Sequence, residues 1–424
     1  MRELRGPQRP RHEPDYVLLL SVVALAALGI LMVYSTTGVP SAVIRDDPFL
    51  IVGPQAMWAA AGLVAMVAMM RLDFRYLRLV SVAGFLVAVA LLVLVLLPSI
   101  GPLQSVEQNG SARWLKIGPL PTMHPAEIAK LALVIYLAHW LDRRGKRAAS
   151  LSGGLLPFLL IVGPVLALVL LEPDLGTTGV LAVTAFTMFV VAGGSLWQLA
   201  LLAPGAAAVL AFMVMRSPYQ MARIQAFLDP WADPQGIGFH TVQGLLALGS
   251  GGLFGIGLGQ SRQPGALHLP QAQNDFVFAV IGQELGLIGG LLVIGLYLLL
   301  AYRGLRVAMA APDTFSALLA TGITAWLTLQ AFINIGVVVV LLPITGITLP
   351  FISAGGSSLV VSFAAVGILL SISRETAPRT LAATTTSGIK RSTGGNADTD
   401  RRRRDWRTHL PGPRRRAQPA RAIH

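Results

Sequence analysis

Residues 259–290, GQSRQPGALHLPQAQNDFVFAVIGQELGLIGG, carry the chain from a polar loop directly into an apolar segment. The loop is rich in Gly, Pro and side-chain amides, and a single carboxylate, Asp275, stands where the apolar residues begin. A carboxylate at a membrane boundary loses part of its hydration, so it needs partners or a function to remain there. The stretch therefore predicts a membrane-spanning helix with Asp275 at its mouth.

The composition extends this interpretation to the whole chain. Of the 424 residues, 54% are hydrophobic and 12% are charged, and the mean hydropathy is +0.67, whereas soluble domains carry about 25% charged residues. The chain has no cysteine, which excludes disulfides and a thiol nucleophile. Since a helix needs roughly twenty apolar residues to cross a bilayer, we predict an all-α integral membrane protein with about ten transmembrane helices. The predicted spans are 16–35, 51–70, 77–98, 124–141, 155–171, 177–193, 196–215, 276–301, 315–341 and 350–373.

The terminal segments differ from the membrane domain in composition. We predict a cytoplasmic N-tail at 1–15, a polytopic membrane domain at 16–375 and a disordered basic cytoplasmic tail at 376–424. From Arg374 onward the chain has 13 basic and 4 acidic residues, which give +9 of its net charge of +13. A segment of this composition cannot bury a core. We expect it to fix the topology and to attract anionic membrane lipids, and we predict no nucleic-acid partner.

Basic residues are distributed unevenly between the two sides of the predicted bundle. An even number of spans puts both termini on one side, which then holds 26 Lys and Arg residues against 6 on the other, with Lys130 inside a span. Because basic residues favour the cytoplasmic side, we predict cytoplasmic termini and two external loops, 99–123 and 216–275. The second loop is large and separates spans seven and eight.

The loop 216–275 is too long for a simple connection, and loops of this length usually have a function. We predict two short amphipathic helices in it, one at YQMARIQAFL that stops before Pro230 and one at HTVQGLLALGSGG. The glycine run GSGGLFGIGLG at 249–259 lacks the GK[ST] ending of a phosphate loop. We interpret its glycines as residues that allow sharp turns and close packing.

The basic residues on the outer side have two interpretations. Arg113 and Lys116 flank Trp114 in NGSARWLKIGPL, and basic residues beside an interfacial Trp often serve as membrane anchors. Alternatively they form an anion site, because Arg and Lys supply the charge-assisted donors that a pyrophosphate needs. The candidates for that site are Arg113, Lys116, Arg216, Arg223 and Arg262.

Two pairs of charged residues near the spans also have alternative roles. Glu127 and Lys130 share a helix face at i and i+3 and can pair, either as a structural clamp or as a polar floor for a charged substrate group. Glu172 and Asp174 stand at a short turn between spans, where Asp174 suits a helix N-terminus. Two carboxylates also allow a divalent cation, Mg²⁺ or Mn²⁺, as a cofactor.

Five stretches of the chain occur together, and in the same order, in a known family. They are NGSARWLKIGPLPTMHPAEIAKLALVIYLA, EPDLGTTG, LALGSGGLFGIGLGQS, LPQAQNDFVFAVIGQELGLIG and LLPITGITLPFISAGGSSL. With these motifs the chain resembles the SEDS family of bacterial cell-wall proteins, which includes FtsW, RodA and SpoVE, across about residues 16–375. The segment GLFGIGLGQSRQ is more similar to the division and sporulation members than to the elongation members.

The resemblance implies a peptidoglycan glycosyltransferase in the bacterial cytoplasmic membrane, with its active site on the outer face. It implies polymerisation of lipid II into glycan strands, for cell division or cell shape, beside a class B penicillin-binding protein as the transpeptidase partner. Asp275 inherits the role of the essential carboxylate. The implied substrate-binding set joins Ser357 to the basic residues above and to Glu127 and Lys130.

Several residues depart from the family pattern around Asp275. Gln271, Gln273 and Asn274 replace Glu, His and Thr of the family, while Gln283 replaces Glu and Ala354 replaces Tyr. These changes remove a titratable His and nearby acids.

The residue inventory suits an inverting glycosyl transfer. One carboxylate can act as the base that draws the proton from an acceptor hydroxyl, and pyrophosphate can leave without an acid if cations stabilise it. A lipid II flippase would share the polar interior and the many spans without needing an outward-facing base. A structural division scaffold would need neither.

Overall fold

The computed structural model describes residues 12–45, 52–97, 103–108, 111–118, 121–262 and 273–376. The predicted tails, 1–15 and 376–424, lie almost entirely outside these ranges, as does Gln271. The described residues all belong to one unit of the chain, Met1–Ala377.

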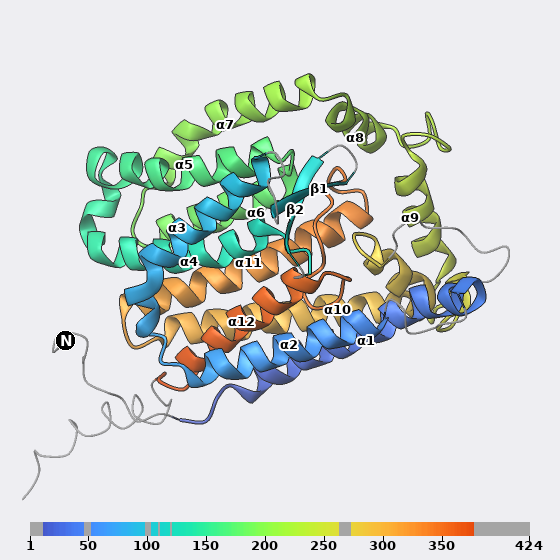
Figure 1. Cartoon of the computed structure of the whole chain (residues 1–424), viewed down its shortest axis with the longest axis horizontal. Helices are drawn as coiled ribbons and strands as arrows, with labels where there is room; N and C mark the ends of the chain where they lie inside the picture. Colours follow the sequence, from blue (N-terminus) through green and yellow to red (C-terminus); the bar gives the residue numbers. More distant parts are fainter. Residues whose placement is uncertain are drawn as a thin grey trace, which may run out of the picture. The chain divides into compact units, whose positions relative to one another are not determined.

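Within these ranges ten long helices occupy the ten predicted spans (Figure 1). Eight helical stretches are long and apolar enough to cross a membrane; α6 is apolar but shorter, and α4 contains Glu127 and Lys130. The prediction of an all-α multi-pass bundle is therefore confirmed. The long helices are α1 (Tyr16–Arg45), α2 (Val52–Arg71), α3 (Tyr76–Leu96), α4 (Pro125–Arg144), α5 (Leu156–Leu171), α6 (Leu175–Val191), α7 (Leu196–Arg216), α10 (Val277–Met309), α11 (Thr314–Val338) and α12 (Gly356–Ser373).

One predicted loop contains a β-hairpin instead. In the segment 99–123, β1 (Leu103–Gln108) pairs antiparallel with β2 (Ser111–Ile117), and the register is interrupted between Val106 and Glu107. Leu115 also exchanges two backbone hydrogen bonds of 2.9 Å with Met123, just before α4. The hairpin is therefore fastened to the start of α4, which gives the residues of β2 defined positions.

The two helices predicted in the long loop are both present. They are α8 (Pro218–Leu228), which ends before Pro230 as expected, and α9 (Phe239–Ser250). Ser217 caps α8, because its side chain accepts a hydrogen bond from the Gln220 backbone N–H. The remaining short helical segments are η2 (Gly145–Ala149), η3 (Leu151–Leu155) and η4 (Gln260–Arg262).

The glycine run between α9 and η4 packs against a break in α10. Gly286 has a positive φ of 69° inside α10, where the helix is interrupted. The N–H of Ile256 donates to the Gln283 carbonyl at 3.0 Å, and that of Gly257 donates to the Glu284 carbonyl at 3.1 Å. A Cβ on Gly255 would lie 2.1 Å from the Glu284 carbonyl oxygen, so only glycine allows this approach. The predicted role of these glycines is confirmed.

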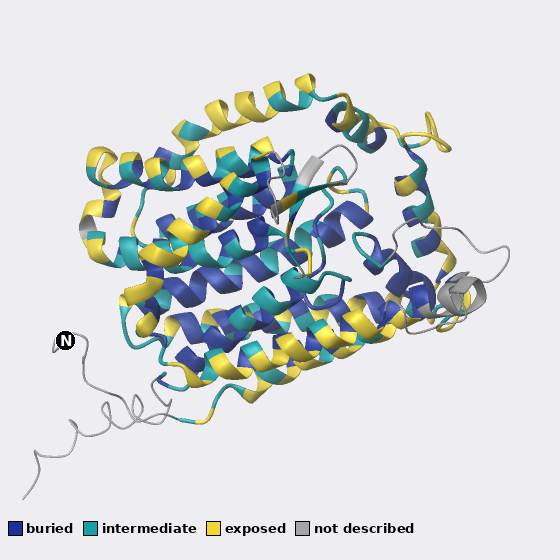
Figure 2. Cartoon of the chain, viewed as in Figure 1, coloured by how far each residue is buried: buried dark blue, intermediate teal, exposed yellow. Residues whose placement is uncertain are grey.

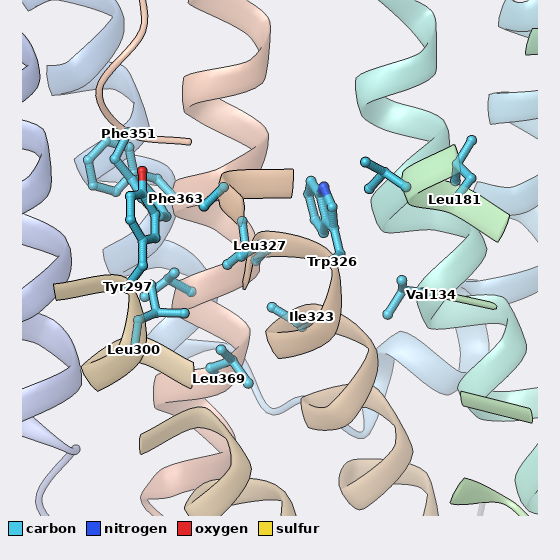
Figure 3. Close-up of a cluster of buried hydrophobic side chains, with 14 of the residues drawn as sticks. Val134, Leu181, Tyr297, Leu300, Ile323, Trp326, Leu327, Phe351, Phe363 and Leu369 are labelled. Carbon is cyan, nitrogen blue, oxygen red and sulfur yellow. The ribbon is translucent and has the colours of Figure 1, made fainter. Parts of the chain in front are cut away.

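Close packing holds the centre of the bundle together. Lipid tails are as apolar as Leu, so helices in a membrane associate through tight contacts at small residues. A Cβ on Gly62 of α2 would lie 2.4 Å from the ring of Phe363, and one on Gly367 of α12 would lie 2.3 Å from the Met66 carbonyl. Figure 2 shows buried residues concentrated in the central helices and exposed ones along α7, where Gln198 alone is buried. Trp326 of α11, Val134 of α4 and Leu181 of α6 lie on different helices and line one small cavity (Figure 3).

The two ends of the described chain meet on one face of the bundle. The His12 N–H donates to the Arg374 carbonyl at 2.6 Å. Beside them Asp15 pairs with Arg303 near the end of α10, with Nη2 and Oδ1 2.7 Å apart. Near these ends Arg78 pairs with Asp313, which caps the start of α11, whereas Asn334 close to the other end of α11 binds the Asp275 carbonyl. A helix rises about 1.5 Å per residue, so Asp313 and Asn334 are on the order of 30 Å apart. The chain ends thus lie together on one face, as an even number of spans requires, and Asp275 lies on the opposite face.

Candidate functional site

A cavity of about 360 Å³ lies on the face that carries Asp275. Residues from β2, α4, α6, α8 and the chain between α11 and α12 line it, so segments far apart in the sequence meet there. It brings together five residues predicted for the site, namely Asp275, Arg113, Glu127, Arg223 and Ser357. The other lining residues are Val106, Trp114, Thr122, His124, Asp174, Thr177, Tyr219, Asn274, Gly346, Ile347, Thr348, Ala354, Gly355 and Ser358.

Asp275 lies in the turn that leads into α10 and lines the cavity. Its backbone carbonyl accepts a hydrogen bond from Asn334 Nδ2 at 2.9 Å. In contrast, neither oxygen of its carboxylate accepts a hydrogen bond from any residue that the structure describes. Burial raises the pKa of Asp275 to about 6, although the Arg223 guanidinium opposes the shift. Asp275 is therefore ionised at neutral pH and poised to take up a proton.

Arg223 reaches the cavity from α8. Its guanidinium carbon stands 4.4 Å from the centre of the Tyr219 ring, and Nη2 donates a hydrogen bond to the Tyr219 hydroxyl. Gly346 separates Arg223 from Asp275, since a Cβ built on this glycine would lie 3.6 Å from both Arg223 Nη2 and Asp275 Oδ2. A cation and a carboxylate thus converge on one residue without a side chain, which leaves room for a substrate group beside both.

Arg113 fastens the hairpin to the turn between α5 and α6. Its Nε donates to the Glu172 carbonyl at 3.0 Å and its Nη2 to the Pro173 carbonyl at 2.6 Å. Pro173 has an unusual positive φ of 29°, so this turn is strained and needs such partners. A guanidinium carries five N–H donors, so Arg113 retains donors for an anion in the cavity. Burial raises the pKa of the Glu172 carboxyl to about 8.

His124 and Asp174 form a second polar pair in the cavity, which the sequence did not predict. Asp174 caps α6 as expected, accepting from the Thr177 backbone at 2.9 Å and from its hydroxyl at 2.8 Å. Its Oδ2 lies 3.8 Å from His124 Nε2. Burial lowers the pKa of His124, although Asp174 opposes the shift. The His124 backbone N–H donates to Ser357 Oγ at 3.2 Å, which fixes Ser357 at the wall.

Glu127 and Lys130 form the predicted pair. Lys130 Nζ donates to Glu127 Oε1 at 2.8 Å, and both residues are buried. Glu127 lines the cavity, whereas Lys130 lies beneath it, where it also donates to Gln330 Oε1 at 2.6 Å. The Lys130 ammonium stands 5.2 Å from the centre of the Trp326 ring. The structure thus shows the predicted ion pair with Glu127 at the cavity wall, and a role of Glu127 toward a substrate stays a prediction.

Two of the basic residues predicted for the anion site do not line the described cavity, and the side chain of a third is not described. Lys116 is exposed on β2, close to the end of the hairpin, and does not line the cavity. Arg216 ends α7, where its guanidinium carbon lies 4.8 Å from the centre of the Phe212 ring, and it does not line the cavity. The side chain of Arg262 lies outside the described residues.

Two amide side chains on α11 support the site and were missed from the sequence. Gln330 Nε2 donates to the Thr348 carbonyl at 3.0 Å, and Asn334 Nδ2 donates to the Ile347 carbonyl at 2.8 Å. A signal was present, because two amides one helical turn apart in an apolar span share one face and are costly to bury without partners.

Within the described ranges, no group of three or more His, Cys, Asp or Glu residues is arranged to hold a metal ion. A divalent cation as a cofactor stays a prediction. The cations that the described cavity supplies are the guanidinium groups of Arg113 and Arg223.

These features define a class of protein, a multi-pass helical membrane protein with a carboxylate and two guanidinium groups in one polar cavity. The family model for cell cycle proteins that comprises FtsW, RodA and SpoVE matches residues 16–378. The chain belongs to this family.

Similar proteins cover nearly the whole membrane domain. Stage V sporulation protein E of Bacillus subtilis (strain 168) is 40% identical over 361 residues, which are 85% of this chain and 97% of that protein. A probable peptidoglycan glycosyltransferase FtsW of Trichlorobacter lovleyi is 41% identical over 372 residues, covering 87% and 95% of the two chains. A solved structure on the coordination of polymerization and crosslinking by a peptidoglycan synthase complex contains a similar chain. It has a TM-score of 0.68 and 30% identity, with 85% of this chain and 98% of that chain covered.

Proposed function

We propose that this protein is a peptidoglycan glycosyltransferase, which polymerises lipid II into glycan strands during cell division or sporulation. The observation that carries the proposal is the convergence of Asp275 and Arg223 on Gly346, where a base and a cation can contact one substrate. The names of the similar FtsW proteins agree with this activity. The reacting groups that we propose are the cavity residues Asp275, Arg223 and Arg113.

Asp275 acts as the general base of the transfer. The acceptor 4-hydroxyl gives its proton to the carboxylate as its oxygen forms a bond to the anomeric carbon of the donor sugar. The bond between that carbon and the pyrophosphate oxygen breaks, and its electron pair stays on the pyrophosphate. Attack opposite the leaving group inverts the configuration, so an α-linked donor gives a β-linked product. The two free oxygens of Asp275 and its pKa of about 6 suit this step at neutral pH.

The leaving group needs cations rather than an acid. Undecaprenyl pyrophosphate departs as an anion, and charge-assisted donors stabilise its developing charge. Arg223 and Arg113 both line the cavity, and burial together with the nearby Arg113 charge lowers the pKa of Arg223. An anionic substrate group would oppose that shift by favouring the charged guanidinium. The two carboxylates at the floor, Glu127 and Asp174, are suited to sugar hydroxyls and the peptide.

The cavity faces outward in this proposal and both chain ends are cytoplasmic. The support is the basic-residue count of 26 against 6, together with the opposite placement of Asp275 and the chain ends. The lipid tail of the substrate then stays in the bilayer while its headgroup enters from outside. Since the chain has no cysteine, single cysteines report the orientation in intact cells. An impermeant thiol reagent should label a cysteine at Ala232 and not one at Ser387, and the reverse pattern would overturn the orientation.

A class B penicillin-binding protein is the partner that we propose. The similar chain in the solved peptidoglycan synthase complex supports it, because crosslinking requires a transpeptidase beside the polymerase. Membrane lipids are the other expected partners, because the basic tail should attract anionic lipids.

The decisive test is glycan formation from purified lipid II by the purified protein with its penicillin-binding partner. We expect glycan strands from the wild-type complex and none from Asp275→Asn. A flippase would instead move lipid II across vesicles without joining it, and that outcome, with no glycan formed, would replace the proposal. A scaffold would do neither.

A further inference from the structure

The segment Gln273–Asp275 enters α10 with three consecutive carbonyls bonded to other parts of the chain. The Gln273 carbonyl accepts from the Ala354 N–H at 2.8 Å, the Asn274 carbonyl from Ser353 Oγ at 2.6 Å, and the Asp275 carbonyl from Asn334 Nδ2 at 2.9 Å. Residues before the first helical turn cannot use helical partners for every backbone group. The position of Asp275 is therefore set by the loop before α12 and by one side chain of α11.

Asn334 makes the bond that lies closest to the reacting group. Its single NH₂ group donates to two carbonyls, that of Asp275 at 2.9 Å and that of Ile347 at 2.8 Å. Two acceptors on one side fix the orientation of the amide, because its oxygen cannot donate to either of them. The opposite atom, Oδ1, is buried without a hydrogen-bond partner in the described structure. A buried acceptor left unpaired costs free energy, so this orientation is maintained by the two carbonyls.

The second carbonyl connects Asp275 to the glycine on which the site converges. Ile347 follows Gly346, whose missing Cβ would stand 3.6 Å from Asp275 Oδ2 and from Arg223 Nη2. The side-chain nitrogen of Asn334 thus links Asp275 to the loop that contains Gly346 and Ile347. Its side chain is 1% exposed and does not itself line the cavity.

We propose that Asn334 is a positioning residue for Asp275, which sets the distance between the carboxylate and the wall at Gly346. This inference rests on the proposed polymerase reaction for its effect on turnover. Its geometric content is independent of that reaction, because it concerns where the side chain of residue 275 lies.

The test replaces Asn334 with leucine, which has a similar size and no donor. In the full-length protein with its penicillin-binding partner, we expect kcat to fall about 10²-fold, as a displacement near 1 Å can cause, while the KM for lipid II stays within about threefold. The pH midpoint of kcat should also move, since the surroundings of Asp275 change. Ser371→Ala is the matched control. It removes a hydroxyl that donates to the Leu72 carbonyl at 2.7 Å, at the other end of the bundle, and should leave both constants and the pH midpoint unchanged.

A second measurement separates this inference from the proposed function. Asp275→Cys creates the only thiol of the chain, and its reaction rate with a small methanethiosulfonate reports its exposure without any turnover. We expect Asn334→Leu to change the reaction rate of this thiol by about tenfold or more, as a change of about one unit in the thiol pKa would. Ser371→Ala should leave the rate unchanged. If the thiol rate changes but wild type forms no glycan, Asn334 positions residue 275 and the polymerase proposal is wrong. If neither the thiol rate nor kcat responds to Asn334→Leu, the positioning role is overturned.

Discussion

Asp275 and Glu284 are carboxylates at the start of the same helix, and their surroundings differ completely. Glu284 is 1% exposed and both of its oxygens accept hydrogen bonds, one from Ser35 Oγ at 2.5 Å and one from Ser261 Oγ. Asp275 faces the cavity, and its oxygens accept no hydrogen bond in the described structure. A carboxylate whose oxygens both accept hydrogen bonds holds structural elements together. A desolvated carboxylate that accepts no hydrogen bond is available to take up a proton.

The hydrogen bonds of Glu284 hold segments that precede Asp275 in the sequence. Ser35 belongs to α1, Ser261 to η4, and the Gly259 N–H donates to Ser35 Oγ at 2.8 Å. The glycine run is thereby tied to α1 and to the first part of α10, ahead of the break at Gly286. Glu284 thus stabilises the packing around the first part of α10, and Asp275 is presented from that rigid element. A rigid support of this kind keeps a reactive group in position.

The strongest way to break this comparison is the same amide exchange at both positions, beginning with Asp275→Asn. We expect glycan formation to fall by about 10²–10⁴-fold, the usual contribution of a positioned base, because an amide does not accept a proton near neutral pH. Folding and partner binding should persist, since Asn is nearly isosteric. The measurement is glycan yield from purified lipid II, with thermal stability recorded beside wild type. Equal yield would remove Asp275 from the mechanism.

The pH dependence sharpens the same point. Because burial raises the pKa of Asp275 to about 6, the rate should rise with pH through about 6 and then level off. Stability has the opposite sign: a raised pKa stabilises the folded protein below the ordinary value near 4, and this contribution is lost as the pH rises through 6. Asp275→Asn should therefore be more stable than wild type at pH 7, with the difference shrinking toward pH 4. A rate that does not vary between pH 5 and 7 would contradict the assignment.

The cations of the site should show an intermediate effect. Neutralising Arg223 or Arg113 removes donors to the pyrophosphate, so Arg223→Gln and Arg113→Gln should each lower kcat/KM roughly 10–200-fold, which corresponds to about 1.5–3 kcal/mol of transition-state stabilisation. Lys116→Ala and Arg216→Ala, which lie outside the cavity, are the matched controls and should remain near wild type. Polymerisation rates of the four variants separate the two groups, and equal rates in all of them would mean that the anion binds elsewhere.

The sequence predicted the bundle well because lipid demands long apolar runs. All ten long helices overlap the predicted spans, and α12 begins at Gly356 rather than 350 because turns occupy the preceding residues. The hairpin was missed, since its two strands are short and rich in polar residues. The break at Gly286 was also missed, because glycine is common within spans and its φ depends on the loop that packs there.

Single residues of the site were predictable when their type conflicted with their location. Asp275 and the outer arginines stood out as charges at a boundary, and two of those arginines do line the cavity. His124 did not stand out, because its importance comes from its tertiary contact with Asp174. Asn334 was marked by its spacing from Gln330, but its bond to the Asp275 carbonyl is a tertiary contact that the spacing does not reveal. Lys116 illustrates the converse, since proximity in sequence to Arg113 did not bring it into the cavity.

The smallest expected effect completes the comparison from the other side. Glu284→Gln keeps one acceptor for Ser35 or Ser261 but replaces charge-assisted hydrogen bonds with neutral ones, which should lower the free energy of unfolding by about 1 kcal/mol. Asp275 and Arg223 stay in place, so glycan formation measured well below the unfolding temperature should remain within about threefold of wild type. The thermal midpoint and the rate are measured on the same preparation as for Asp275→Asn. The two substitutions are chemically alike. If Glu284→Gln lowers stability and Asp275→Asn abolishes activity, the difference between the two carboxylates is due to their surroundings alone. A Glu284→Gln variant that is inactive yet as stable as wild type would instead make Glu284 part of the reaction, because the loss of a purely structural contact would lower the stability of the fold.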